Sequence, residues 1–379
     1  MNDLNRKHEM VRQFTPNWFT ATMGTGILAL ALNQFPIHII GLHVVAQCLW
    51  FLNIALFLLF SILYFARWVA YYEGARRIFG HSVASMFFGA IPMGLATIIN
   101  GFVVFGIPLW GNSALQAARF LWWVDVVMAV ACGVLIPFMM FTRQEHSLET
   151  MTAVWLLPIV AAEVSAASGA LLVMHMPDPQ IALRIVVISY ALWAFSVPLA
   201  MSVLVILLMR LVLHKLPPSD MAATGWLALG PIGTGALGLI LLGSDANQIF
   251  PAAGLPGIGE VAFGLGVIGG SMLWGYGLWW LLIALLTTRH YLHHGMPFNL
   301  GWWGFTFPIG VYAIATLALA RQTHIGFLFV VGGVLVAGLS GLWLTIATRT
   351  LHGAWQGHLF ISPCLVPGSI PEDRIIEPI

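Results

Sequence analysis

Long apolar stretches separated by short polar segments follow one another through almost the whole chain. Each stretch is long enough for an α-helix to cross the roughly 30 Å hydrocarbon layer of a membrane. The predicted helices are Asn17–Gln34, Leu42–Phe65, Ser82–Phe105, Phe120–Phe141, Met151–Met174, Ile181–Leu213, Ala222–Gly243, Gly257–Leu286, Gly301–Ala320 and Gly326–Thr348. No long polar insert interrupts this series. The pattern therefore predicts an all-α integral membrane protein with ten transmembrane helices.

Composition strengthens this interpretation, because 60% of the 379 residues are hydrophobic and only 8% are charged. So few charges cannot cover a water-exposed surface, so we expect a lipid bilayer around most of the protein. The formal net charge of +1 gives no sign of a nucleic-acid partner. The three cysteines, Cys48, Cys132 and Cys364, show neither ligand nor disulfide spacing. We predict no metal and no cofactor.

The predicted domain boundaries follow from the same pattern. Residues 17–350 form the transporter domain, residues 1–16 an N-terminal segment and residues 351–379 an irregular tail rich in proline and acidic residues. The N-terminus is too polar for a signal peptide, so we expect the first apolar stretch to remain as a helix.

Basic residues gather on one side of this topology. The side with both termini holds Arg6, Lys7, Arg12, Arg67, Arg76, Arg77, Arg143, Arg210, Lys215, Arg289, Arg349 and Arg374, and the other side holds Arg119, Arg184 and Arg321. Positive residues are retained in the cytoplasm. The sequence therefore predicts a multi-pass protein of the plasma or inner membrane with both termini cytoplasmic.

A short Pro-x-Gly pattern recurs about every seventy residues, always in an odd-numbered helix. Its complete copies are Pro92-Met93-Gly94, Pro231-Ile232-Gly233 and Pro308-Ile309-Gly310, and its partial copies are Thr22-Met23-Gly24 and Pro158-Ile159. One repeat has the length of a helical hairpin, so the pattern predicts five tandem hairpins. Since a proline inside a helix removes a backbone hydrogen bond, we expect kinked odd helices around a central pore and even helices outside them.

The predicted pore has the chemistry of an anion path, although prolines also free carbonyl groups and do not decide the sign alone. The odd helices contain no Lys or Arg, and their acidic groups, Glu163 inside the fifth and Asp245 near the outer end of the seventh, form no ring. Hydroxyl, amide and backbone N–H groups remain to hold an anion. The predicted lining is Thr22, Gly24, Thr25, Pro92, Gly94, Thr97, Asn100, Pro158, Pro231, Gly233, Thr234, Thr306, Pro308 and Gly310.

Glu163 lies about half-way across the fifth helix, where an ionised carboxylate is costly. Either it is protonated and bonded to a neighbouring helix, or it faces water and couples proton movement to the anion. Asp125 on the fourth helix is expected to pair with Arg119 or Arg184. The histidines His290, His293 and His294 are interpreted as a solvated loop cluster rather than a metal site.

A membrane-embedded enzyme is the alternative from another functional class. It would need a nucleophile with a base, a metal triad or paired carboxylates at mid-membrane, and Glu163 stands alone there. The chain also lacks a phosphate-binding GxxxxGK[ST] motif. We therefore predict no enzymatic activity.

Four motifs carry a resemblance to a known family: PNWFTATMGTGI at Pro16–Ile27, WLLPIVAAEVSAASG at Trp155–Gly169, LGPIGTGALGLILLG at Leu229–Gly243 and GWWGFTFPIG at Gly301–Gly310. In this order they resemble the tellurite-resistance/dicarboxylate transporter family of sulfite efflux pumps, malate permeases, tellurite-resistance proteins and slow anion channels, and most of all its sulfite-efflux branch. The resemblance, from about Pro16 to Thr348, implies five tandem hairpins with a pore in each protomer of a homotrimer.

Several members of that family close the pore with a phenylalanine in the ninth helix. Phe307 matches that position best, and Phe305 is the neighbouring candidate. A ring there would block the pore sterically and by dewetting, whereas the alternative is an aromatic residue packed between helices.

The predicted function is transport of a small inorganic or dicarboxylate anion. Tight recognition of a dicarboxylate usually recruits arginine in bidentate geometry, and the predicted lining has none. This favours export of sulfite or hydrogensulfite, with proton coupling as one version. The alternatives are a C4-dicarboxylate (malate) transporter and a gated anion channel.

Overall fold

The computed structural model of the protein describes residues 9–360, and these contain helices and no strand. The α-helices are α2 (Thr20–Asn33), α3 (Leu42–Ala70), α4 (Tyr72–Arg77), α5 (Ala90–Gly101), α6 (Ile107–Trp110), α7 (Asn112–Thr142), α8 (Leu157–Val173), α9 (Pro179–His214), α10 (Leu229–Ala252), α11 (Pro256–His294), α12 (Thr306–Thr323) and α13 (Gly326–Gln356). Shorter helical turns are η1 (Pro16–Phe19), η2 (Ile78–Gly80), η3 (Ala84–Gly89), η4 (Phe102–Gly106), η5 (Ala153–Leu156), η6 (Ser219–Ala228), η7 (Leu300–Phe305) and η8 (His358–Phe360).

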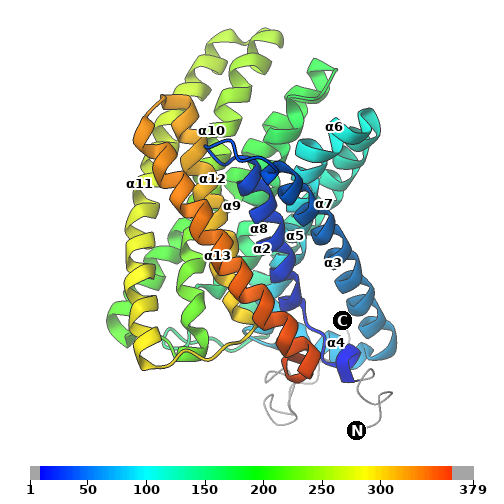
Figure 1. The fold of residues 1–379 in the computed structure, drawn as a ribbon, viewed down its shortest axis with the longest axis vertical. Helices are drawn as coiled ribbons and strands as arrows, with labels where there is room; N and C mark the ends of the chain where they lie inside the picture. Colours follow the sequence, from blue (N-terminus) through cyan, green and yellow to red (C-terminus); the bar gives the residue numbers. More distant parts are fainter. Residues whose placement is uncertain (1–8, 361–379) are drawn as a thin grey trace.

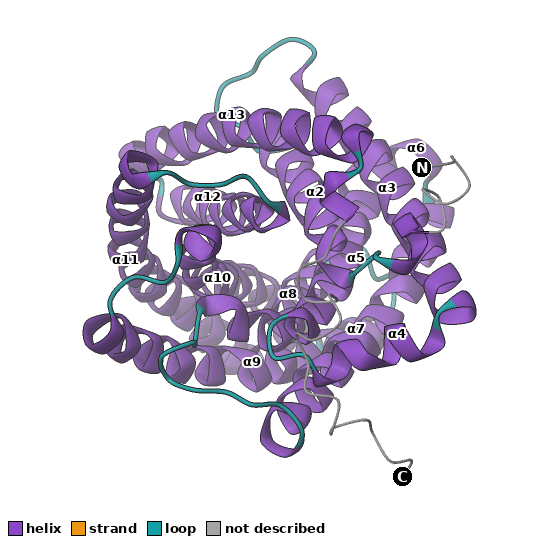
Figure 2. Cartoon of the chain, turned by 90° about the horizontal axis from the view of Figure 1, so that it is seen from below, coloured by secondary structure: helices purple, strands orange, loops and turns teal. Residues whose placement is uncertain are grey.

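The long helices form two concentric rings. Figure 2 shows α2, α5, α8, α10 and α12 in the inner ring and α3, α7, α9, α11 and α13 around them. In the most apolar stretch of each segment, 78–100% of the residues are buried for the inner segments that begin at Ala84, Ala153, Ser219 and Leu300, against 17–33% for the outer helices. The predicted all-α membrane fold with odd helices inside is confirmed.

Nine helical segments among the described residues are long and apolar enough to cross a membrane. The first predicted helix is not among them, because η1 and α2 are short and rich in polar residues such as Asn17 and Thr22. It nevertheless takes its place in the inner ring beside α5 and α12 (Figure 2). Residues Thr20 to Ala31 of α2 are all buried.

Both ends of the membrane domain lie at the same end of the molecule. In Figure 1, α2 begins and α13 ends at the lower end, which we call the lower end throughout. α13 continues to Gln356, so the predicted irregular tail begins with helix. The remainder of that tail from residue 361, and residues 1–8, lie outside the described residues.

The repeated prolines mark a change of helix type rather than a mid-helix kink. Pro92, Pro158, Pro231 and Pro308 each lie within the first three residues of an α-helix that continues a 3₁₀-helix. The first N–H groups of an α-helix have no partner within that helix, so these prolines remove no α-helical hydrogen bond. The prediction that they interrupt helix interiors is wrong.

Candidate functional site

A small cavity lies on the axis of the inner ring, in its lower half. All five inner segments contribute to its wall, and its volume of about 40 Å³ leaves room for a few water molecules. Its lining consists of Thr20, Met23, Phe87, Met93, Val154, Leu156, Leu157, Val160, Thr224, Leu227, Gly230, Pro231, Leu300, Gly301, Trp303, Gly304, Phe307 and Pro308. We call it the axial cavity.

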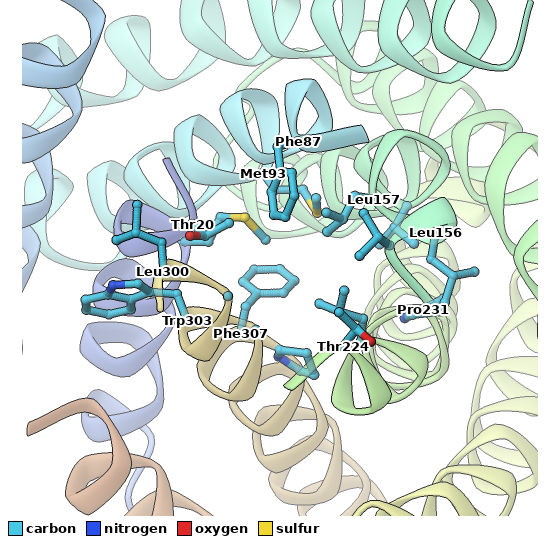
Figure 3. A pocket seen from close by; sticks show the side chains of 18 residues that line it. Thr20, Phe87, Met93, Leu156, Leu157, Thr224, Pro231, Leu300, Trp303 and Phe307 are labelled. Atoms are coloured by element: carbon cyan, nitrogen blue, oxygen red, sulfur yellow. The ribbon is translucent and has the colours of Figure 1, made fainter. Parts of the chain in front are cut away.

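The ring of Phe307 points into the middle of the axial cavity (Figure 3). Phe307 is 3% exposed and is the second residue of α12, directly before Pro308. The turn that carries it is held by a bond of 2.7 Å from Thr306 Oγ1 to the Trp303 carbonyl, and Trp303 donates to Thr350 Oγ1 over 3.1 Å. The Phe307 ring therefore stands in the axial cavity, on a helix start held by these neighbouring bonds.

Phe305, the second gate candidate, has different surroundings. It is also 3% exposed, but its ring packs against Trp226 and Trp302 with centroid distances of 5.6 and 5.8 Å. It does not belong to the lining of the axial cavity. Phe305 therefore packs against tryptophans, whereas Phe307 faces the axial cavity.

The lining shows a regularity that the sequence contained but that our prediction did not use. The residue directly before the repeated proline lines the cavity in three segments, as Leu157, Gly230 and Phe307. The residue four positions before that proline does so in the same three segments, as Val154, Leu227 and Gly304. Of these residues, Val154, Leu227 and Gly304 lie in the 3₁₀-helices η5, η6 and η7, and Leu157, Gly230 and Phe307 lie within the first two residues of the α-helices that follow.

Of the fourteen residues predicted to line the pore, Pro231 and Pro308 lie on the axial cavity. Three of the predicted threonines use their hydroxyl protons within their own helix. Thr22 donates to the Phe19 carbonyl, Thr97 to the Gly94 carbonyl and Thr306 to the Trp303 carbonyl, each over 2.7 Å. The bonds of Thr22 and Thr306 span the junction of a 3₁₀-helix and an α-helix, whereas that of Thr97 lies inside α5. All three leave no hydroxyl proton for an anion.

The predicted glycines lie where neighbouring inner helices touch. A Cβ added at Gly94 would stand 2.3 Å from Thr22 Oγ1, and one at Gly24 would stand 2.2 Å from Thr306 Oγ1. In the same way Gly233 faces the Tyr312 backbone at 2.9 Å and Gly310 faces Ile27 at 2.5 Å. The structure therefore gives the repeated glycine a role in closing the inner ring.

The other predicted polar residues lie in buried contacts. Thr25 Oγ1 accepts a 3.0 Å bond from Trp343 Nε1, which ties α2 to α13. Asn100 Oδ1 and Thr234 Oγ1 are buried and have no partner among the described residues. Neither these residues nor Pro92 and Pro158 line the axial cavity, although Met93 and Leu157 beside the two prolines do.

Glu163 is fully buried between α8 and α9. The Ser196 hydroxyl lies 3.1 Å from Glu163 Oε2 and 2.9 Å from the Ile159 carbonyl, and Glu163 Oε1 has no partner among the described residues. A hydroxyl has one proton and cannot donate to both acceptors. A protonated Glu163 that donates to Ser196, while Ser196 donates to Ile159, satisfies all three groups.

Asp125 is buried in the same manner, and the predicted ion pair with Arg119 or Arg184 is wrong. Ser165 Oγ lies 2.5 Å from Asp125 Oδ2 and 3.2 Å from the Ala161 carbonyl. Across residues 9–360 the one salt bridge joins Arg12 to Glu9. Asp125 lies buried within the apolar part of α7, away from the interface at which an arginine could pair with its charge.

The histidine cluster lies at the lower end of α11. The rings of His290 and His294 are 4.2 Å apart, and His294 Nδ1 contacts the His290 carbonyl at 2.8 Å. Among the described residues no group of three metal-ligating side chains forms.

Comparison with known proteins agrees with this architecture. The profile of a family described as voltage-dependent anion channel matches residues 13–351. The chain is 38% identical to the sulfite efflux pump of Trichophyton rubrum over 353 residues, which cover 92% of this chain and 93% of the relative. An uncharacterized transporter of Methanocaldococcus jannaschii is 28% identical over 356 residues, with 93% of this chain and 97% of the relative covered.

A further relative carries a different substrate in its name. The malic acid transport protein of Schizosaccharomyces pombe is 22% identical over 328 residues, which cover 83% of this chain and 72% of the relative. The family profile extends over nearly all of the ring of inner and outer helices. The chain therefore belongs to the voltage-dependent anion channel family.

Proposed function

We propose that the protein transports small anions across a membrane and that it exports sulfite or hydrogensulfite. The observation that carries the proposal is the axial cavity, which all five inner segments build and in which the ring of Phe307 stands. A barrier with this position suits a conduit that opens and closes. The 38% identity to a sulfite efflux pump over 92% of the chain supports the choice of anion. The proposal includes no enzymatic activity.

The cavity lining supports sulfite over malate. It contains no Lys or Arg, and its side-chain hydroxyls are those of Thr20 and Thr224. Two carboxylates of a malate ion would be held best by bidentate arginines, and the small volume also favours a compact ion. The lower identity of 22% to a malic acid transport protein points in the same direction.

We further propose that Phe307 is the gate and that the lower end faces the cytoplasm. Twelve basic residues belong to the lower side of the predicted topology and three to the other, which is the distribution of cytoplasmic loops. The exposed apolar faces of the outer helices suit a lipid bilayer and leave room for the contacts of a homotrimer.

Proton coupling at Glu163 completes the proposal. The hydrogen bonds of Ser196 favour a neutral Glu163 carboxyl in this structure. Glu163 can therefore release a proton only after a rearrangement that admits water. Glu163 is three residues beyond Val160, which lines the axial cavity. One turn of helix thus separates the carboxyl from the proposed path.

Flux measurements in proteoliposomes of the purified protein test this function. We expect uptake of radiolabelled sulfite, faster with an imposed pH gradient, and little uptake of malate. Malate accumulation against its gradient would replace the proposal with a proton-linked dicarboxylate carrier. Nitrate or chloride currents that follow voltage alone would identify a gated channel.

A further inference from the structure

A second cavity lies beside the axial one, between the lower ends of α9 and α11 and the 3₁₀-helix η6. It is lined by Met151, Thr152, Ala153, Leu207, Arg210, Leu211, Leu216, Pro217, Ala222, Thr224, Gly225, Trp280, Ile283, Ala284, Thr287 and Tyr291. Its volume is about 40 Å³. We call it the side cavity. Thr224 of η6 belongs to the walls of both cavities, and Figure 3 shows it at the axial one.

The side cavity contains the positive charge that the axial cavity lacks. Arg210 is 4% exposed, and its Nε and Nη2 donate to the Glu149 carbonyl while Nη1 donates to the Lys215 carbonyl. These bonds occupy three of the five guanidinium N–H groups. Among the described residues, no carboxylate pairs with Arg210. Its buried charge is therefore not neutralised by the part of the chain that the structure describes.

Other donors in the lining are also unused. Trp280 is 2% exposed, and its Nε1 has no acceptor among the described residues. The Thr152 hydroxyl accepts a bond from the Val154 N–H, which leaves its own proton free. The lining holds no acidic side chain. A cationic group with spare N–H donors, in a cavity of this size, has the chemistry of a site for a small oxyanion.

We propose that the side cavity is an anion-binding antechamber, in which Arg210 holds the oxyanion before it passes Thr224 into the axial cavity. The inference rests on the proposed anion transport and adds the group that selects the charge. It also explains how an axial cavity without Lys or Arg can serve an anion, because the positive charge comes from Arg210 near the lower end of the outer helix α9. The neutral axial cavity then binds weakly enough to let the ion move on.

Two substitutions test the antechamber independently. Arg210→Gln removes the charge, and Gly225→Leu fills the space, since a Cβ at Gly225 meets no atom within 4 Å. In proteoliposomes sorted so that the termini face outward, we expect both to raise the KM for outside anion by about tenfold, the size of one charged hydrogen bond, with kcat little changed. Arg210→Lys should recover part of the affinity. The matched controls are Arg289→Gln and Gly275→Leu on the exposed surface of α11, and these should behave as wild type.

The measurement uses whichever of sulfite, malate and nitrate the wild type transports. Transport of nitrate without sulfite would overturn the proposed substrate. The KM values for nitrate in the same variants would then test the antechamber. The antechamber would be overturned if the KM were unchanged in both Gly225→Leu and Arg210→Gln. If Arg210→Gln also had a lower unfolding temperature, the role of Arg210 would be to stabilise the fold by its bonds to backbone carbonyls. Absence of any anion flux in the wild type would overturn both proposals.

Discussion

The inner and outer rings are made of similarly apolar helices but differ in what their residues touch. Outer helices expose large side chains such as Phe141, Val212 and Trp355, whereas inner helices are almost wholly buried against protein. Inner neighbours approach closely at glycines, and glycines of α13 such as Gly338 and Gly341 face open space. Hydrophobicity therefore identifies the membrane segments, and the extent of burial against protein separates the inner ring from the outer one.

The largest effect that separates the two rings is expected for an inner glycine. A Cβ at Gly89 in η3 would stand 2.1 Å from the Leu157 carbonyl oxygen, a backbone atom that cannot move without shifting α8. We expect Gly89→Ala to destabilise the fold by about 3 kcal/mol or more, at or beyond the upper end of overpacking costs. Thermal unfolding in detergent, followed by size-exclusion chromatography, measures this.

Gly341→Ala in α13 is the matched outer-ring change, because its Cβ meets no atom within 4 Å. We expect an unchanged or slightly raised unfolding temperature, since alanine favours a helix over glycine by up to about 1 kcal/mol. Equal losses of stability in both variants would break the comparison between the rings.

The second effect concerns two neighbouring phenylalanines of the ninth membrane segment. Phe307→Ala should raise anion flux roughly tenfold or more, because removal of the ring lowers the barrier on the axis by at least about 1.4 kcal/mol. Phe305→Ala should reduce stability through lost contacts with Trp226 and Trp302 and leave the flux of the folded protein unchanged. Single-channel or proteoliposome flux, normalised to folded protein, compares them. Higher flux in Phe305→Ala alone would move the gate to that residue.

The third effect distinguishes the two buried carboxyls, Glu163 on an inner helix and Asp125 on an outer one. Glu163→Gln keeps a donor for Ser196 but cannot release a proton. We expect the several-fold acceleration of sulfite flux by a pH gradient to disappear in this variant and to persist in Asp125→Asn. The pH profile of flux measures both, and an unchanged profile in Glu163→Gln would remove its coupling role.

Much of this comparison was predictable from the sequence, because apolar length and the repeat of about seventy residues are both properties of hairpins in a membrane. The repeat correctly identified the inner helices, but our physical reason for it was wrong. Pro92 and Pro231 occupy the first turn of an α-helix, whereas Pro137 and Pro198, inside outer helices, carry no repeat. A proline's helix position depends on where the preceding 3₁₀ turn ends, which periodicity does not reveal.

The site was harder to predict than the fold for a related reason. Hydroxyls and glycines on inner helices suggested a polar path, but Thr22 and Gly94 face each other across a helix contact. The residue before the repeated proline was the better signal in three segments, and Phe307 occupies that position in one of them. Arg210 was not predicted as a site residue because it lies on an outer helix, and we looked for charged residues only on the predicted inner helices.

The smallest expected effect concerns the entry to an inner segment from the lower end. His81 Nδ1 accepts the N–H groups of Val83 and Ala84 at 3.1 and 3.2 Å and so caps the start of η3. Burial lowers the pKa of His81 from its ordinary value of 6.5. Below that pH the unfolded chain binds a proton that the folded chain resists, so stability should fall as the pH drops from about 7 to about 5. The loss should approach about 1 kcal/mol, the usual value of a cap.

His81→Asn keeps a capping acceptor that does not titrate, so its unfolding temperature should change less between these two pH values than that of the wild type. Burial also lowers the pKa of His146, in the loop before η5, so both proteins retain a residual pH dependence of the same sign. The difference between wild type and variant isolates the cap. If the unfolding temperatures of the wild type and the variant changed equally between pH 7 and pH 5, His81 would contribute no pH-dependent cap. The start of η3 would then be held only by its packing against neighbouring helices.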